Sequence, residues 1–303
     1  LVLLVPFVFF SAAKSDYNLV FVEVSPGIFI NFGKNEAPNK ANGWAISNTG
    51  FIIGDESVLV IDAGPSYQYA SEMIEYIKKV TNSQINYLVI THHHPDHSFG
   101  ISKFLEIDTK VIISNSELKN YLKYGNKLLL QMKKKVGDDW FKNTSIIEFN
   151  NNKQKFPFSI DLGNRKIDIN LYTDGHSAGD LTVTDKKSHI VFSGDLVFNE
   201  RAPTIPHANI LNWLRYLDEI SNFNWSGLVP GHGPIIKKKN KLDFTKKWIQ
   251  HIHYIARDAV KKGLSPAEVL DLGVPEFLSS TKLAKETWNR DVPILMKHYE
   301  NDN

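Results

Sequence analysis

The sequence predicts a layered α/β sandwich in one continuous domain. Three observations support this class: alternating apolar segments that read as hairpins, a strand that runs directly into a loop and helix, and helices gathered toward the carboxyl end. A purely parallel sheet is disfavoured, because hairpins join antiparallel strands. The 303 residues are 42% hydrophobic and 22% charged. This is an ordinary globular composition that suffices to fill a core.

The predicted strands are short apolar or alternating segments bounded by turn residues. The first two pairs flank residues 25–27 (SPG) and 54–56 (GDE). Both triplets are typical of turns, so each pair is expected to form a hairpin. In chain order, the expected strands are residues 19–24, 28–32, 49–53, 58–61, 87–90, 111–114, 159–162, 166–172, 181–184 and 190–193.

The predicted helices have apolar positions three or four residues apart. In the first of them, Met73, Ile74, Ile77 and Val80 recur at this spacing. Residues 265–268 (SPAE) combine an N-cap serine, a first-turn proline and the glutamate of a capping box, which is typical of a helix start. The expected helices are residues 69–80, 116–135, 210–220 and 244–262, and one that begins at this capping box.

Composition excludes several classes of site and partner. The chain has no cysteine, so disulfides, a thiol nucleophile and thiolate metal ligands are excluded. Any metal would be held by nitrogen and oxygen atoms alone. The formal net charge of +2 provides no strongly basic face for nucleic acid or an anionic membrane. We therefore expect a small-molecule substrate and neither of those partners.

The amino-terminal segment resembles a leader peptide. Residues 1–10 (LVLLVPFVFF) form an uncharged apolar run, about half the length of a bilayer crossing. Small residues at 11–13 (SAA) and polar residues follow, as at a signal-peptidase site. We predict a signal peptide at residues 1–13, with its first residues missing, a domain at 14–303, and a periplasmic or secreted protein. A buried first strand is the alternative.

A histidine-rich loop at residues 92–97 (HHHPDH) carries the strongest chemical signal. Imidazoles and carboxylates are ligands for borderline divalent metals. In an extended loop His92 and His94 project to the same side, so they can hold one ion. Asp96 and His97 follow a proline that bends the chain, so they can face a second ion.

Three later segments each offer one further ligand just after a predicted strand. They are residues 174–180 (DGHSAGD), 193–195 (SGD) and 230–234 (PGHGP), where small residues let backbone and substrate approach closely. We assign the first metal to His92, His94 and His176, and the second to Asp96, His97 and His232, with Asp195 bridging the two.

This signature resembles that of the metallo-β-lactamase superfamily. The resemblance implies a four-layer αββα sandwich with a dinuclear site at one edge, between two sheets. A closer resemblance, to the quinoprotein relay system zinc metallohydrolases related to the sulfur-oxidation protein SoxH, implies a link to a periplasmic quinoprotein dehydrogenase system. It rests on residues 48–56 (NTGFIIGDE), 60–64 (VIDAG) and 194–204 (GDLVFNERAPT).

The expected activity is zinc-dependent hydrolysis of an ester, lactone, thioester or amide. Two zinc ions that share a water supply hydroxide near neutral pH. The leading role expected for Asp96 is that of a metal ligand; the alternative is to orient this water or return a proton to the leaving group, although a carboxylate bound to metal is a poor base. Iron or manganese would also suit the ligands. The alternatives are iron-dependent oxidation of sulfur compounds such as a persulfide, and a metal-retaining accessory protein of the quinoprotein system.

Three residues are predicted to orient the metal-binding imidazoles from behind. Asp62 ends a predicted strand, and its rival role is to cap a turn. Thr91 and Ser193 adjoin predicted ligands and are expected to act in the same way.

Three further residues are placed near the predicted ligands by the sequence. His93 lies between two ligands on the opposite side of the chain, so a structural role is expected. Arg201 and His207 lie in the loop after Asp195 and are predicted to contact the substrate, where an arginine could clamp a substrate carboxylate. Surface ion pairing is their alternative role.

Overall fold

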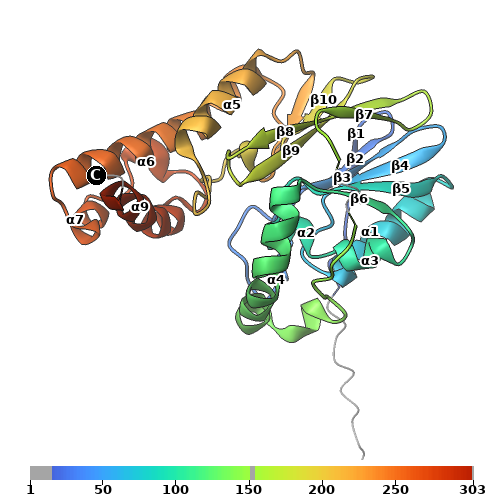
Figure 1. Ribbon diagram of the computed structural model, residues 1–303, viewed down its shortest axis with the longest axis horizontal. Coiled ribbons are helices and arrows are strands. Elements are labelled where there is room, and N and C mark those ends of the chain that lie inside the picture. The colour runs from blue at the N-terminus through green and yellow to red at the C-terminus, as the bar shows by residue number, and fades with distance from the viewer. Residues whose placement is uncertain (1–15, 151–153, 302–303) are drawn as a thin grey trace, which may run out of the picture.

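The computed structural model describes residues 16–150 and 154–301 and shows two β-sheets packed face to face (Figure 1). Helices cover the outer face of each sheet, so the fold is the predicted α/β sandwich with four layers. The predicted signal peptide at residues 1–13 lies outside the described residues. Within those residues, no helix is long and apolar enough to cross a membrane.

The first sheet runs in chain order from β1 to β6. Its first four strands pair antiparallel, and β5 and β6 then continue in parallel beside β4. Two parallel strands must be joined by a crossover connection. Between β4 and β5 this connection contains α1 (Tyr67–Val80). The strands are β1 (Val22–Ser25), β2 (Ile28–Asn31), β3 (Thr49–Ile53), β4 (Ser57–Ile61), β5 (Gln84–Val89) and β6 (Lys110–Ile112).

The second sheet has the order β11-β10-β9-β8-β7. Strands β7 to β10 pair antiparallel, whereas β11 lies parallel to β10 after a crossover through α5 (Ile210–Asn222). The strands are β7 (Phe158–Asp161), β8 (Lys166–Thr173), β9 (Gly179–Asp185), β10 (Ile190–Phe192) and β11 (Gly227–Val229).

Three apolar layers hold the sandwich together. The middle layer joins the inner faces of the two sheets, with Ile30 and Leu59 from the first and Ile169 and Val183 from the second fully buried. A second layer lies beneath α1 and α4. A third joins the outer face of the second sheet to α5 and continues between α5, α6 and α9, which project beside the sandwich. The remaining helices are α2 (Pro95–Ser98), α3 (Ile101–Leu105), α4 (Asn115–Val136), α6 (Asp243–Lys261), α7 (Pro266–Asp271), α8 (Glu276–Ser279) and α9 (Ala284–Asn301).

Both predicted hairpins, the longer helices and the capping box at Ser265 are confirmed, with ends shifted by a few residues. The sequence analysis missed β11, because its three residues are too few to show a period. It also missed α9 as a separate helix. Pro293 lies inside that helix, and a proline there is normally a sign that a helix ends.

Arg165, in the turn between β7 and β8, ties the two sheets together. Its Nη1 donates to the carbonyls of Pro26 and Ile53 in the first sheet, both at 2.9 Å. Its Nε and Nη2 donate to the two carboxylate oxygens of Asp185, both at 3.0 Å. Burial alone would raise the pKa of Asp185, but the bonds from Arg165 and Ser188 hold it below its ordinary value.

We predict that Arg165→Met lowers the free energy of unfolding by about 3 kcal/mol, because it leaves the buried Asp185 carboxylate unpaired. Since the pKa of Asp185 is lowered in the folded state, the pair stabilises the protein above about pH 4. This contribution disappears as the pH falls through the folded-state pKa, so the difference between variant and wild type should narrow in acid.

Denaturant unfolding followed by circular dichroism at pH 7 and at about pH 3 tests this prediction. The matched control is Lys186→Met, which removes an exposed pair with Asp168 and should cost less than about 1 kcal/mol. Equal losses in the two variants would contradict the role given to Arg165.

Candidate metal centre

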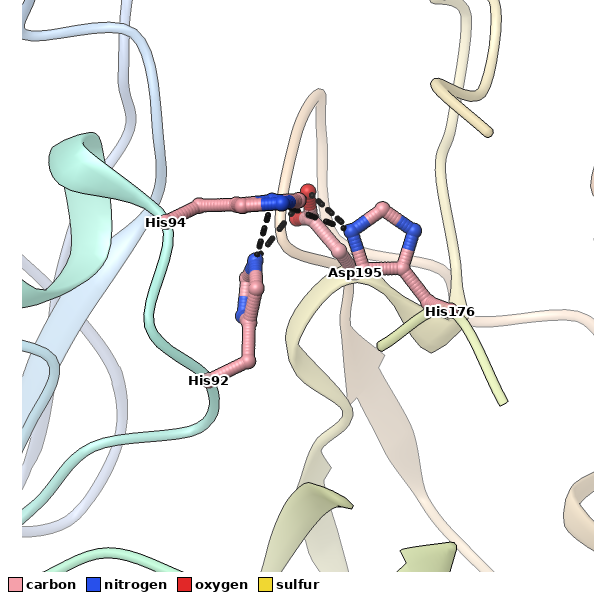
Figure 2. A group of neighbouring side chains, drawn as sticks. All are labelled: His92, His94, His176 and Asp195. Carbon is pink, nitrogen blue, oxygen red and sulfur yellow. Dashed lines mark hydrogen bonds and ion pairs between the residues drawn. The ribbon is translucent and has the colours of Figure 1, made fainter. Parts of the chain in front are cut away.

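Four side chains from both sheets point toward one another at one edge of the sandwich (Figure 2). His92 and His94 lie in the loop that follows β5, and His176 lies in the loop between β8 and β9. Asp195 lies in the short 3-10 helix that follows β10. Loops at strand ends are free to turn side chains toward a common point, while the sheets fix their starting positions.

The donor atoms of these four residues have the spacing of a single coordination shell. His94 Nδ1 lies 2.9 Å from His92 Nε2 and 3.2 Å from His176 Nε2. Asp195 Oδ2 lies 3.7 Å from His92 Nε2 and 3.5 Å from His176 Nε2. Tetrahedral zinc with bonds of about 2.0–2.1 Å would separate its ligands by about 3.3 Å. The four atoms therefore fit one divalent cation.

A second group of donors shares Asp195 with the first. Asp195 Oδ1 lies 3.3 Å from His97 Nε2 and 3.4 Å from His232 Nε2. Asp96 Oδ2 lies 3.7 Å from His97 Nε2 and 3.4 Å from His232 Nε2. Both His97 Nε2 and Asp195 Oδ1 are buried and have no hydrogen-bond partner. Such buried donors without partners fit a site built for a cation.

The structure thus brings together all the residues that the sequence analysis assigned to metals, in the two predicted groups. Burial lowers the pKa of His176 to about 4, which keeps the imidazole in the neutral form that binds metal. Burial would raise the pKa of Asp195, but the His232 and His97 imidazoles hold it well below its usual range. Burial would lower the pKa of His97, but Asp195 and Asp62 hold it well above its ordinary value.

Asp62 and Thr91 set the orientation of two imidazoles from behind. Asp62 Oδ2 accepts from His97 Nδ1 at 2.7 Å, and Asp62 Oδ1 accepts from the backbone N–H of Thr91 at 2.8 Å. The Thr91 hydroxyl donates to Asp62 Oδ2 at 3.0 Å and lies 3.1 Å from His92 Nδ1, from which it can accept. These bonds hold the Nδ1 protons and leave both Nε2 atoms free to face a cation.

Ser193 does not orient any of these imidazoles, so its predicted role is wrong. Its hydroxyl donates to the carbonyls of Gly194 and Val229, both at 3.2 Å. The residue directly follows β10, where the side chain lies against the backbone of the neighbouring β11. Although Ser193 is close to Asp195 in the sequence, its side chain does not contact any donor imidazole.

His93 lies against the donor His94, with ring centroids 4.9 Å apart, and its Nδ1 is directed at Glu117 in the first turn of α4. Its ring Nδ1 and its backbone N–H both lie within hydrogen-bonding distance of Glu117 Oε2, and Glu117 is fully buried. The sequence analysis missed Glu117. The available signal was the spacing Ser114-x-x-Glu117, which resembles a capping box, although this carboxylate binds His93 instead of the helix terminus.

Arg201 and His207 both contact histidines of the donor groups. Arg201 is buried with Nη1 3.1 Å from His232 Nδ1, so the surface ion pair considered for it is wrong. His232 Nδ1 donates to the carbonyl of Ile46 at 2.7 Å. His207 Nδ1 lies 3.1 Å from His94 Nε2 and can accept its proton. This bond leaves His94 Nδ1 facing the first donor group.

Asn48 clamps the loop that carries the last histidine, and the sequence analysis missed this function. Its Nδ2 donates to the carbonyls of Pro230 and Gly233, both at 2.8 Å, and its backbone N–H donates to Gly231. A side chain at Gly231 would collide with Asp195 Oδ1. Close approach of this loop to the shared carboxylate therefore requires glycine.

Comparison with known proteins agrees with this geometry. A family model described as "Metallo-beta-lactamase superfamily" matches residues 42–235, a span that includes every donor residue of both groups. The chain belongs to the metallo-β-lactamase superfamily. Solved metallo-β-lactamases have the same fold, with TM-scores of 0.57 for the Pontibacter korlensis protein and 0.58 for the Hirschia baltica protein. The Pontibacter korlensis protein is 18% identical, and the match covers 77% of this chain and 99% of that protein. The Hirschia baltica protein is 16% identical, and the match covers 76% of this chain and 97% of that protein.

Curated relatives within the superfamily have diverse names. Beta-lactamase-like protein 2 homolog of Caenorhabditis elegans is 26% identical, over 80% of this chain and 72% of its own. Human acyl-coenzyme A thioesterase MBLAC2 is 24% identical, over 65% of this chain and 74% of its own length. A linear primary-alkylsulfatase of Pseudomonas is 20% identical over 73% of this chain, but the match spans only 48% of that longer protein.

We predict that Asp62→Asn lowers the affinity of the centre for Zn2+ by about 10–100-fold, because it weakens the bond that orients His97. Competition with a chromophoric chelator measures this affinity. The matched control is Ser193→Ala, which removes a buried hydroxyl that touches only backbone carbonyls and should leave the affinity unchanged. Equal affinity in Asp62→Asn and wild type would refute the orienting role.

Proposed function

We propose that this protein is a dinuclear zinc hydrolase that cleaves an ester, lactone, thioester or amide in a small molecule. Its membership of the superfamily and its thioesterase and sulfatase relatives make it a hydrolase with a His/Asp site for divalent metal. One observation carries the finer proposal. The two oxygens of Asp195 face two separate donor groups, an arrangement that suits two neighbouring cations.

Zinc ions held in both groups would supply a hydroxide nucleophile near neutral pH and polarise the scissile carbonyl. The residues of the chain position this chemistry. Asp195 holds the two groups in a fixed relation, and Asp62 and Thr91 keep two imidazoles in the required tautomer. Asp96 is proposed to act mainly as a ligand, and its alternative role is to orient the attacking water or return a proton to the leaving group.

The names of the relatives support hydrolysis of a thioester or ester. MBLAC2 is named as an acyl-coenzyme A thioesterase and the Pseudomonas relative as an alkylsulfatase. On the motifs at residues 48–56, 60–64 and 194–204, we further place the chain among the SoxH-related quinoprotein relay system metallohydrolases. That placement and the leader-like residues 1–13 support export and work beside a periplasmic quinoprotein dehydrogenase.

The second candidate is iron-dependent oxidation of a persulfide or similar sulfur compound. It is favoured by the donor set, which holds only nitrogen and oxygen atoms and so also suits iron. The third candidate, an accessory protein that merely retains metal, is disfavoured by the complete donor set. A purely binding role does not require a carboxylate shared between two cation sites.

We predict that purified protein holds about two zinc ions per chain. His232→Ala should lose about one of them and lower kcat at least about 100-fold, because it removes a donor of the second group. Metal analysis by mass spectrometry and a panel of ester, lactone, thioester and amide substrates test both parts. The control is His189→Asn, which changes an exposed histidine outside both groups and retains a residue suited to its left-handed backbone.

Two results would decide against this proposal. Iron in the isolated protein, together with oxygen uptake on addition of persulfide, would select the oxidation reaction. Full zinc loading without turnover of any substrate class in the panel would select the accessory role.

A further inference from the structure

A cavity of about 520 Å³ lies between the terminal helices and the loops of the metal centre. Its volume is within the range of small-molecule sites. Helices α5, α6 and α9, which project beside the sandwich in Figure 1, form most of its wall. We call it the helical pocket, and its charged and imidazole side chains are Asp174, His207, His253, Arg257, Lys261 and His298.

The helical pocket lies beside the metal centre, because two of its lining residues adjoin donors of the first group. His207 lines the pocket, and its Nδ1 is 3.1 Å from Nε2 of His94, a donor of the first group. Asp174 also lines the pocket and precedes His176 by two residues. His207 therefore connects the wall of the pocket to the first donor group, so a ligand bound in the pocket lies next to that group.

The charges in the helical pocket favour an anion. His253, Arg257 and Lys261 are spaced four residues apart on α6, so they lie along one side of the helix. Neither Arg257 nor Lys261 forms an ion pair within residues 16–150 and 154–301, whereas the adjacent Lys262 is paired with Asp258 at 2.7 Å. Asp174 is the only acidic residue in the lining.

The rest of the lining is partly apolar, with Ile210, Val260 and Leu295 among its residues. A ligand that carries both carbon skeleton and negative charge matches such walls better than a free inorganic ion. Two neighbouring cations one helical turn apart also match a dianionic phosphate better than a single carboxylate.

We propose that the helical pocket, through Arg257 and Lys261, binds a phosphate-bearing part of the substrate that is hydrolysed at the metal centre. This inference rests on the proposed hydrolase function and narrows it to substrates with a phosphorylated group beyond the scissile bond. Arg257 and Lys261 act in binding and specificity, since neither belongs to the donor groups.

Paired thioesters test the proposal in the zinc-loaded protein. Butyryl-coenzyme A carries phosphates on its leaving group, whereas S-butyryl-N-acetylcysteamine presents the same scissile bond without them. For the double variant Arg257→Ala/Lys261→Ala, kcat/KM for butyryl-coenzyme A should fall about tenfold, mainly through KM. Its value for the truncated thioester should stay within about twofold of wild type.

Two controls separate charge recognition from structural damage. Lys262→Ala removes an exposed neighbouring lysine outside the helical pocket and should change neither substrate's kinetics. In the wild type, KM for butyryl-coenzyme A should rise with ionic strength, and this dependence should weaken in the double variant. Equal losses for both thioesters would overturn the proposal.

A binding measurement keeps the test independent of turnover. Calorimetry should show coenzyme A binding to wild type and Lys262→Ala, with about tenfold weaker binding to the double variant. If neither thioester is hydrolysed, thioesterase activity is excluded while the coenzyme A affinities still decide on the helical pocket. Equal affinities in all three proteins, or inorganic phosphate binding as tightly as coenzyme A, would overturn it.

Discussion

The shared carboxylate of Asp195 is the constraint on which the rest of this site depends. It is buried, charged and in contact with imidazoles of both donor groups. A buried carboxylate is costly unless positive charge or hydrogen bonds compensate it. Two cations, one at each oxygen, would provide that compensation. The site therefore requires that loops from both sheets bring their donors to the same carboxylate.

The sandwich meets this requirement by fixing the loops through the backbone. Asn48, just before β3, holds the loop around Gly231 by side-chain and backbone hydrogen bonds. Asp62, just after β4, accepts hydrogen bonds from Thr91 and His97. Residues at the ends of strands in the first sheet thus position donors on its own loops and also His232, which follows β11 of the second sheet. These hydrogen bonds keep the donor side chains in place, so the geometry of the site does not depend on a bound cation.

The terminal helices have a double role in this arrangement. They extend the apolar layer on the outer face of the second sheet, because α5 joins that layer and α6 and α9 continue it beside the sandwich. They also bring the side of α6 that bears Arg257 next to the loop of His207, which contacts the first donor group. The superfamily fold holds the donor residues, whereas the residues of this helical layer can differ between members and so change which substrate is bound.

The sequence by itself determined the fold class, most strands and helices, and the donor residues, because these depend on local periodicity and on residue types that follow strand ends. The sequence placed Asp62 and Thr91 behind the donor imidazoles, but only the tertiary structure decided which imidazole each one contacts and where the other predicted contacts fail. Asp62 and Glu117 bind imidazoles from other segments, Ser193 turns to backbone carbonyls, and Arg201 is buried instead of paired at the surface. Such contacts join residues far apart in the chain, and their orientation follows from the packing of whole layers, which no local pattern encodes.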